Sequence, residues 1–492
     1  MIKVVVAASE MAPFVKTGGL ADVSGALPKY INRDKFEVIA VIPYYSSIKS
    51  DSSEIEYIGT FSVPDSGASV KCGLFKTTVQ GSSVPLYLLR YGPYFDRGGI
   101  YGEEGADYDD NDRRFSFFCR GLLEMCRAIG FVPDLIHCND WQTGLIPVFL
   151  KTLYSGDLLF SSTSTLFTIH NLAFHGSFDP ERIISITGLP WSVYSMYGAE
   201  FYGGFSFLKS GLYFADYIST VSRRYSEEIQ SEEYGMGLQG LLRSRRGTLT
   251  GIVNGVDYHV WDPETDQMIS ANYSCDDIDK KRVNTEELCR ECVLEYKKGV
   301  PVIGMITRLT EQKGIDLVAG IIDRLMMKDV RFVLLGTGDE YYHSLFSALK
   351  EKYSGRFHVT LGFDEKFSHR IYAGSDIFLM PSRFEPCGLG QIISLRYGTI
   401  PVARETGGLA DTITDYGPAD KPDACGTGFL FKEYSSDAFY ECVERSLEVY
   451  RDNGKWRGVM SNAMKADFSW RSSAIEYEKI YRKLCVTSEG IS

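Results

Sequence analysis

Short apolar, β-branched stretches recur along the first half of the chain and alternate with longer amphipathic stretches. The apolar stretches are VVVAAS, VIAVIPY, PLYLLR, DLIHC, LFTIH and YISTVS. Runs of this length predict buried β-strands, and the amphipathic stretches between most of them predict helices. Because strands that alternate with helices form βαβ units, this half is expected to contain a parallel sheet.

The same alternation restarts after LTGIVNGVD, with PVIGMITR, VRFVLLGTG, HVTLGF, IFLMPS, TIPVARE and GTGFLF as predicted strands. We place the boundary between the two domains at the Asn-Gly dipeptide of this stretch, because that dipeptide is typical of a tight turn. This gives two doubly wound α/β domains, residues 1–253 and 254–465, expected to face each other across a cleft. Residues 466–492 contain the helical sequence WRSSAIEYEKIYRKL, which we expect to pack back on the N-terminal domain.

Composition narrows the classes of partner. With 492 residues the chain is too long for one hydrophobic core, and 44% hydrophobic with 24% charged residues is typical of a globular protein. The net charge of -12 repels polyanions, so no nucleic-acid or membrane partner is expected. The opening MIKVVVAASEM has no leader of signal length and predicts the first strand.

The 11 cysteines are scattered without a repeating framework, which indicates reduced thiols and a cytoplasmic protein. Cys289 and Cys292 form a CxxC pair in a helical stretch that lacks a second ligand pair at zinc-finger spacing. We interpret them as two thiols on one helix face and expect no metal site and no cofactor.

Candidate ligand-binding residues follow the predicted strands, because ligands bind beyond the carboxyl ends of parallel strands. The first group is Lys16, Gly18 and Gly19 in KTGGLADVSGALPKYI, directly after the first strand. Backbone N–H groups at a helix start favour a diphosphate, and the lysine adds a positive charge. A glycine turn that only joins strand to helix fits this stretch equally well.

A second group is Arg308 and Lys313 in MITRLTEQKGIDL. These two cations converge on one diphosphate if the turn folds back, and otherwise they are ordinary surface charges. As exposed cations they should contribute little to stability.

The third group is Glu385, Cys387, Gly388 and Leu389 in PSRFEPCGLGQIISLRYG. The carboxylate can accept hydrogen bonds from sugar hydroxyls, and the amides that open the next helix can donate to sugar or phosphate oxygens. Pro386 at a helix start and a surface acid explain the same residues without a ligand.

Polar residues also end two neighbouring predicted strands, Asp140 in HCNDW and His170 with Asn171 in TIHN. Such residues point into the expected cleft, where sugar hydroxyls need orienting partners. A buried structural histidine remains the alternative for His170.

Together these motifs resemble the ADP-glucose-dependent glycogen and starch synthases of glycosyltransferase family 5, along nearly the whole chain. The matching stretches are KTGGLADV, HCNDWQTGL, IHNLAFHG, FSFLKSGLYFADYISTVS, YGMGLQGLL, NGVD, TRLTEQKG, FSHRIYAGSD, PSRFEPCGLGQ and RETGGLADT. The resemblance implies a GT-B architecture of two Rossmann-like domains. The N-terminal starch synthase catalytic domain would lie on the acceptor side, and the C-terminal group 1 glycosyl transferase domain would hold the nucleotide sugar.

The resemblance also implies the activity of a hexosyltransferase. Glucose from ADP-glucose would be transferred, with retention, to the non-reducing end of an α-1,4-glucan, and ADP released. Lys16 and the amides of Gly18 and Gly19 would meet the distal phosphate, and Arg308 with Lys313 would reach the same diphosphate.

The remaining roles that the resemblance implies concern the sugar and the base. Glu385 and the amides that follow it would hold the glucosyl hydroxyls, and His170 and Asn171 would hold the sugar from the other domain. Asp140 would face the sugar or the acceptor. Phe363 stands where the family commonly has a tyrosine against adenine.

Two positions depart from wider family patterns. Ile393 stands where the larger retaining superfamily often has a second glutamate, so that acid has no part in the mechanism. Asn139 stands where many relatives have a histidine, which puts a contribution from that imidazole in doubt.

The motifs supply no obvious carboxylate nucleophile for double displacement. We therefore favour a same-face substitution in which the departing diphosphate takes the acceptor's proton. A phosphorylase or nucleotide-sugar epimerase of the same architecture, and an inactive glucan-binding or scaffolding relative, are the alternative functions.

Overall fold

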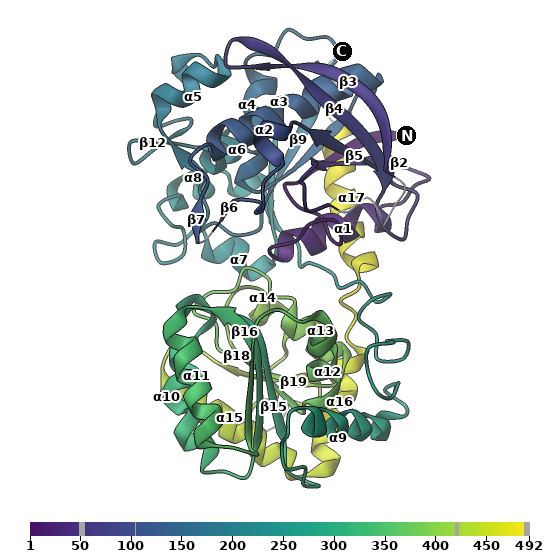
Figure 1. Ribbon diagram of the computed structural model, residues 1–492, viewed down its shortest axis with the longest axis vertical. Coiled ribbons are helices and arrows are strands. Elements are labelled where there is room, and N and C mark those ends of the chain that lie inside the picture. The colour runs from purple at the N-terminus through teal and green to yellow at the C-terminus, as the bar shows by residue number, and fades with distance from the viewer. Residues whose placement is uncertain (49–54, 104, 419–422, 487–492) are drawn as a thin grey trace. The chain divides into compact units, whose positions relative to one another are not determined.

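A computed structural model describes residues 1–48, 55–103, 105–418 and 423–486 of the chain. It divides into two compact units. Unit 1 is Met1–Gly255 with Trp470–Ser492, and unit 2 is Val256–Ser469. Each unit has a central, mainly parallel sheet with helices around it (Figure 1), which confirms the prediction of two doubly wound α/β domains. Residues 487–492 of the predicted C-terminal segment lie outside the described residues.

Among the described residues, the sheet of unit 1 has nine strands, and β4 runs antiparallel to both of its neighbours, β3 and β5. Its order is β14 (Leu249–Gly251), β13 (Tyr217–Thr220), β9 (Ser164–Ile169), β8 (Leu135–Asn139), β1 (Ile2–Ala7), β2 (Phe36–Pro43), β5 (Pro85–Arg90), β4 (Ala68–Thr78) and β3 (Glu56–Asp65). Small strands outside this sheet are β6 (Gly102–Glu103), β7 (Ala106–Asp107), β10 (Ser177–Phe178), β11 (Glu200–Phe201) and β12 (Gly204–Ser206).

The long hairpin of β3 and β4 was not predicted from the sequence. Its turn holds Ser66 and Gly67 at φ 50° and 78°, the left-handed conformation of hairpin turns. Only Phe61 and Val63 of β3 are buried, so the strand lacks the continuous apolar run that marks the central strands. Alternation with one face in solvent gives a weaker signal than full burial.

Helices of unit 1 lie between these strands. They are α1 (Gly19–Tyr30), α2 (Gly92–Phe95), α3 (Asn111–Ile129), α4 (Leu145–Lys151), α5 (Pro180–Thr187), α6 (Phe207–Phe214), α7 (Arg223–Glu228), α8 (Gln239–Ser244) and α17 (Trp470–Val486), with 3-10 turns η2 (Trp141–Thr143), η3 (Trp191–Val193) and η4 (Arg246–Thr248). Among the described residues, no helix is both long and apolar enough to cross a membrane.

The last of the described helices, α17, is part of unit 1. It contacts α1, β8 and β9, and buries Trp470, Tyr477 and Tyr481. The Tyr481 hydroxyl lies 2.8 Å from Nδ1 of buried His137, whose Nε2 lies 2.6 Å from the Thr168 hydroxyl. Burial lowers the pKa of His137 to about 3, so this imidazole is neutral and links the helix to two strands.

Unit 2 contains a six-stranded sheet in which all neighbouring strands are parallel. Its order is β17 (Phe357–Leu361), β16 (Arg331–Gly338), β15 (Val302–Leu309), β18 (Ile377–Met380), β19 (Ile400–Arg404) and β20 (Phe429–Phe431). The helices are α9 (Lys281–Glu291), α10 (Ile315–Met326), α11 (Glu340–Lys352), α12 (Glu365–Gly374), α13 (Gly390–Arg396), α14 (Gly407–Thr412), α15 (Ser436–Tyr450) and α16 (Asn453–Lys465), with 3-10 turns η5 (Ile278–Lys280) and η6 (Glu311–Lys313).

Both sheets reverse their winding direction beside a central strand. In unit 1, β1 lies between β2 and β8, and in unit 2, β15 lies between β16 and β18. The loops that leave two such neighbouring strands diverge to opposite faces, which leaves a crevice at the carboxyl ends of the strands. Ligand-binding residues are therefore expected after β1 and β8 in unit 1, and after β15 and β18 in unit 2.

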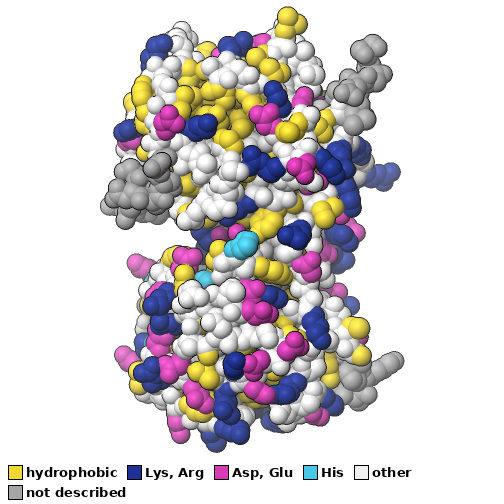
Figure 2. Space-filling view, turned by 90° about the vertical axis from the view of Figure 1, so that its right-hand side faces the viewer, with side chains coloured by type: hydrophobic (Ala, Val, Ile, Leu, Met, Phe, Trp, Pro, Cys, Tyr) yellow, Lys and Arg dark blue, Asp and Glu magenta, His cyan; other side chains and the backbone are white. Residues whose placement is uncertain are grey.

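The surface on view in Figure 2 carries basic and acidic side chains interspersed with one another.

We predict that Tyr481→Phe lowers the free energy of unfolding of unit 1 by about 1–3 kcal/mol, because the change leaves a buried imidazole nitrogen without its partner. Urea denaturation followed by tryptophan fluorescence measures the effect. Lys479→Ala on the same helix is the control, since Lys479 is exposed and pairs only with Glu476 at the surface. Equal midpoints for the two variants would contradict the prediction.

Candidate functional site

The turn after β1 leaves the first amides of α1 open to a ligand. Gly18 is the N-cap residue, and no side chain caps the helix. A Cβ atom added at Gly18 or Gly19 would meet nothing within 4 Å, and neither residue has a positive φ. Packing and backbone conformation therefore do not require these glycines, whereas close approach of a ligand to the backbone would.

Glu10 organises this turn, and the sequence analysis missed it. Its buried carboxylate accepts hydrogen bonds from the Thr17 amide at 2.6 Å, the Gly18 amide at 3.2 Å and the Tyr101 hydroxyl at 3.0 Å. Burial raises the pKa of Glu10 even though these donors act in the opposite direction. The signal was an acid three residues after the end of a mainly apolar strand, β1. Because Glu10 already holds the Gly18 amide, the Gly18 amide is not the open donor that we expected.

Lys16 is also engaged within the turn. Its ammonium lies 2.7 Å from a carboxylate oxygen of Asp22 on the first turn of α1, and both side chains are partly exposed. An exposed pair of this kind contributes little stability, so a phosphate can compete for the lysine at small cost.

Asp140 follows β8 in a strained backbone conformation, with φ 57°. Its Oδ1 accepts a hydrogen bond of 2.7 Å from the His170 amide, so it joins the ends of β8 and β9. Burial raises the pKa of Asp140 to about 7, and the amides of His170 and Asn171 act in the opposite direction. Positive φ at a residue other than glycine is concentrated at functional sites.

Asn139 holds the imidazole of His170. The Asn139 amide nitrogen donates to the carbonyl of Ala7 at 3.0 Å, so its oxygen faces His170 Nε2 at 2.9 Å and accepts a hydrogen bond from the N–H there. That fixes the tautomer, with Nδ1 as the acceptor nitrogen. Burial lowers the pKa of His170 to about 3, so the ring is neutral at physiological pH. Asn139, which stands where many relatives have a histidine, thus holds the His170 ring in position. Asn171 accepts from the Ala173 amide at 3.0 Å in the following turn.

In unit 2, the loops after β15 and β18 meet through Lys313 and Glu385. The lysine ammonium lies 2.6 Å from a carboxylate oxygen of Glu385, and the two side chains are 18% and 6% exposed. Ser382 donates to the same oxygen at 3.1 Å. Gly314 has φ 71°, and a Cβ there would lie 2.0 Å from the carbonyl of Pro381, so only glycine allows the two loops to approach this closely.

This geometry corrects one expectation. We expected Lys313 to be an exposed cation with little effect on stability, but it pairs with a buried carboxylate. Removal of the lysine leaves Glu385 charged and buried, which is destabilising. Arg308, near the end of β15, is exposed as expected.

The segment that follows Glu385 is fixed by the glycines of α14. The Gly408 amide donates to the Glu385 carbonyl at 3.0 Å. A Cβ at Gly407 would lie 1.9 Å from that carbonyl oxygen, and one at Gly408 would lie 2.1 Å from the carbonyl of Cys387. Cys387 is buried, Gly388 has φ 73°, and Leu389 is the N-cap residue of α13. Packing therefore explains the glycines of this second TGGLAD sequence, but not those of the first.

Phe363 and Ile393, two further positions singled out in the sequence, are not part of the Lys313–Glu385 contact. Phe363 follows β17 with 78% of its surface exposed, so its ring is available for stacking. Ile393 is buried within α13 and contributes only to packing.

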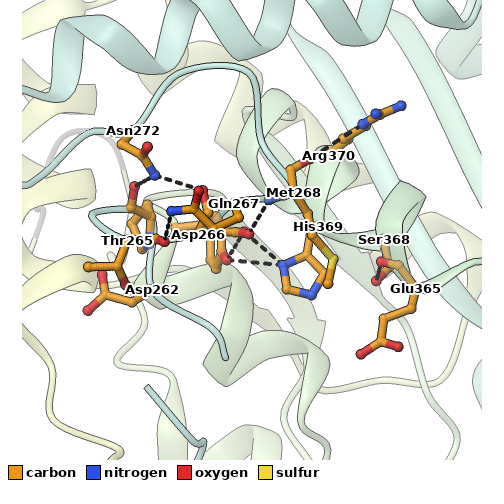
Figure 3. Close-up of polar contacts among 12 residues, drawn as sticks. Asp262, Thr265, Asp266, Gln267, Met268, Asn272, Glu365, Ser368, His369 and Arg370 are labelled. Carbon is orange, nitrogen blue, oxygen red and sulfur yellow. Dashed lines mark hydrogen bonds and ion pairs between the residues drawn. The ribbon is translucent and has the colours of Figure 1, made fainter. Parts of the chain in front are cut away.

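The histidine of FSHRIYAGSD belongs to a structural network (Figure 3). Its Nδ1 lies 2.7 Å from Oδ2 of Asp266, which also accepts from Tyr397, and Trp261 stacks on the His369 ring at 3.8 Å. Despite burial, these hydrogen bonds lower the pKa of Asp266. The network ties the segment around Asp266 to α12.

Cys289 on α9 and Cys292, the C-cap residue that follows it, are buried and form no disulfide, in line with the interpretation as packed thiols. Within the described ranges, no group of three or more His, Cys, Asp or Glu side chains is arranged to hold a metal ion.

Comparison with known proteins places these features in one family. Residues 3–244 match the starch synthase catalytic domain, and residues 293–458 match the glycosyl transferases group 1. The chain is 46% identical to a glycogen synthase of Desulforudis audaxviator over 98% of this chain and 96% of the relative. It is 45% identical to a glycogen synthase of Moorella thermoacetica, with the same coverage.

A solved structure gives the same result. The catalytic domain of starch synthase IV from Arabidopsis thaliana, bound to ADP and acarbose, superposes with a TM-score of 0.91. It is 33% identical, and the match covers 99% of each chain. The chain belongs to the glycogen and starch synthase family of GT-B glycosyltransferases.

Proposed function

We propose that the chain transfers glucose from ADP-glucose to the non-reducing end of an α-1,4-glucan, with retention, through the loops at the two switch points. The observation that carries the proposal is the meeting of Lys313 and Glu385 after β15 and β18, where a parallel sheet binds its ligand. The test of the activity is incorporation of labelled glucose from ADP-glucose into glycogen.

The diphosphate of the donor takes its positive charges from both units in this proposal. Arg308 and Lys313 contact it from unit 2, and Lys16 with the Gly19 amide contacts it from unit 1. Each lysine exchanges its carboxylate partner, Glu385 or Asp22, for phosphate oxygens. The exposed ring of Phe363 stacks on adenine.

The glucosyl group is held by acceptors and donors at strand ends. Glu385, released from Lys313, accepts hydrogen bonds from sugar hydroxyls, and the amides of Cys387, Gly388 and Leu389 donate to the sugar. His170 and Asn171 contact the sugar from unit 1, and Asp140 faces the sugar or the acceptor.

Cleavage of the bond between glucose and the diphosphate separates charge, and the site must stabilise that charge. The departing diphosphate gains negative charge, which the cations stabilise, and it accepts the proton of the attacking hydroxyl on the same face. His170 is neutral, so it adds no positive charge beside the oxocarbenium-like sugar. The buried thiols are consistent with a cytoplasmic location, which forms part of the proposal.

We predict a strong preference for ADP-glucose over UDP-glucose, since a purine offers Phe363 a larger stacking surface. Phe363→Ala should raise KM for ADP-glucose about tenfold and leave kcat nearly unchanged, because the base is remote from the breaking bond. Steady-state kinetics with both donors measure this. Tyr341→Ala, which removes another exposed ring of unit 2, is the control. Equal kcat/KM for the two donors would contradict the preference.

Lys313→Ala should reduce kcat by ~100-fold or more, equivalent to ~3 kcal/mol, with a smaller change in KM, since diphosphate charge grows in the transition state. Lys313→Arg should not restore full activity, because a planar guanidinium cannot place its charge where a compact ammonium lies beside Gly314.

The stability of these Lys313 variants separates the two roles of the lysine. Lys313→Ala should also lower the melting temperature, because Glu385 loses its buried partner, and Lys313→Ala with Glu385→Gln should recover most of that loss without recovering kcat. A folded Lys313→Ala protein with near-wild-type kcat would refute the catalytic assignment. Arg308→Ala should lower kcat similarly without the loss of stability, since Arg308 is exposed.

Asp140→Asn should remove a pH dependence of stability. The pKa of Asp140 is about 7 in the folded chain against 3.8 in the reference state, so the folded form retains a proton that the unfolded form loses. Stability therefore falls as pH rises from about 4 to about 7 and stays lower above that range. The asparagine keeps the acceptor oxygen for the His170 amide but cannot ionise.

We expect Asp140→Asn to be at least as stable as wild type at about pH 8, with kcat reduced at least tenfold through loss of the carboxylate. Thermal melts across this pH range and steady-state kinetics measure both. A normal kcat would make Asp140 purely structural.

A further inference from the structure

A buried glutamine, Gln391, lies next to the loop that we propose to hold the sugar. It is fully buried in α13, and its Nε2 lies 2.9 Å from the carbonyl oxygen of Cys387, 3.0 Å from that of Gly388 and 3.1 Å from the hydroxyl of Thr412. Gln391 and Thr412 end two of the stretches that matched in the sequence, PSRFEPCGLGQ and RETGGLADT. The sequence analysis gave neither residue a role.

These contacts determine which way the side-chain amide of Gln391 faces. The Thr412 hydroxyl donates its own hydrogen to the Gly408 carbonyl, at 2.6 Å, so toward Gln391 it can only accept. All three neighbours of the Gln391 nitrogen are therefore acceptors, and the amide turned by about 180° would place an oxygen against them. The NH2 group of Gln391 thus faces the two carbonyls of the loop.

The two carbonyls set the direction of the amides that follow them. In a planar trans peptide, as both of these are, the C=O and the next N–H point to opposite sides. Because Gln391 holds the carbonyls of Cys387 and Gly388, the N–H groups of Gly388 and Leu389 are directed away from it. Both of these residues are partly exposed, and neither amide donates to any other residue that the structure describes. They are two of the three amides in the proposed sugar site.

The same side chain accounts for the glycine at position 388. A Cβ atom at Gly388 would lie 2.4 Å from Oε1 of Gln391, and Gly388 has φ 73°. Oε1 itself is buried and has no hydrogen-bond partner among the described residues, which costs about 1–3 kcal/mol. That cost offsets much of what the hydrogen bonds of Nε2 contribute to stability, so a gain in stability does not explain the glutamine. Its contacts with the carbonyls point instead to a role in the geometry of the loop.

The loop is held from two helices at once. The Gly408 amide on α14 donates to the Glu385 carbonyl at 3.0 Å, and Gln391 on α13 donates to the carbonyls that follow. Thr412 on α14 joins the two, since its hydroxyl contacts both the Gln391 nitrogen and the Gly408 carbonyl. Glu385 and the amides after it are thus fixed by groups that are themselves buried.

We propose that Gln391 is a positioning residue for the glucosyl group of the donor. It does not touch the sugar. It fixes the two peptide planes so that the Gly388 and Leu389 amides already point at the sugar oxygens before the donor binds. Donors fixed in this way need not reorganise during bond cleavage, so a small displacement of them costs both affinity and rate. The inference rests on the proposed function, because it concerns the same sugar site.

Replacement of Gln391 should impair recognition of the sugar but not of the nucleotide. Gln391→Met keeps most of the side-chain volume and removes the donor. Without a glucan acceptor no transfer occurs, so calorimetry can measure the dissociation constants of ADP-glucose and ADP. We expect Gln391→Met to raise the dissociation constant of ADP-glucose about tenfold and that of ADP less than about twofold, and to lower kcat about tenfold. Gln391→Asn retains an amide but is too short to span both carbonyls, and should show the same selective loss.

Thr412→Val is the matched control. It removes one partner of the same buried amide but leaves both carbonyl contacts, so it should lower the melting temperature as Gln391→Met does and bind ADP-glucose like wild type. Equal effects of Thr412→Val and Gln391→Met on ADP-glucose, including no effect of either, would overturn the proposal, and so would equal losses for ADP and ADP-glucose. Wild type that neither binds ADP-glucose nor transfers glucose would instead refute the proposed function, and this inference with it.

Discussion

A central strand with parallel neighbours on both sides determines where each unit can bind a ligand. Helices that leave β1 and β8 in unit 1, or β15 and β18 in unit 2, must go to opposite faces of their sheet. The backbone at those strand ends is therefore exposed between two diverging loops. The glycines at these strand ends are present for different reasons. A side chain at Gly314 would collide with a neighbouring carbonyl, whereas a Cβ atom at Gly18 or Gly19 would contact nothing. Gly18 and Gly19 therefore have open space around them, and the amide of Gly19 is the one that a ligand can reach.

Much of the fold was predictable because the central strands are buried on both faces and give unbroken apolar runs. The hairpin of β3 and β4 was not, because one face of β3 is in solvent and its apolar residues only alternate. The candidate residues were predictable by type and by their position after a strand. Their pairing was not, since the Lys313–Glu385 contact joins loops 72 residues apart. Glu10 was missed because a single acid has no motif of its own.

Both lysines that we propose to bind the diphosphate of ADP-glucose form ion pairs with carboxylates in the structure. Lys16 lies against Asp22 and Lys313 against Glu385, so each of these two lysines already has a carboxylate partner. A negatively charged ligand must displace a carboxylate at both positions, and the displaced Glu385 becomes available to a neutral hydroxyl. Discrimination then depends on a ligand that supplies phosphate oxygens and hydroxyls together, because either alone leaves a buried group without a partner.

The path of the chain has a consequence for biosynthesis. Unit 2 lies in the sequence between Gly255 and Trp470, and a Cβ at Gly255 would lie 2.5 Å from the backbone of Trp470. The helix that covers β8, β9 and α1 is thus translated after all of unit 2. During synthesis the nascent unit 1 keeps the imidazole of His137 and its apolar neighbours uncovered until all of unit 2 has left the ribosome. Unit 2 is contiguous and can fold first, so a nascent-chain chaperone would be needed most by the half that is translated first.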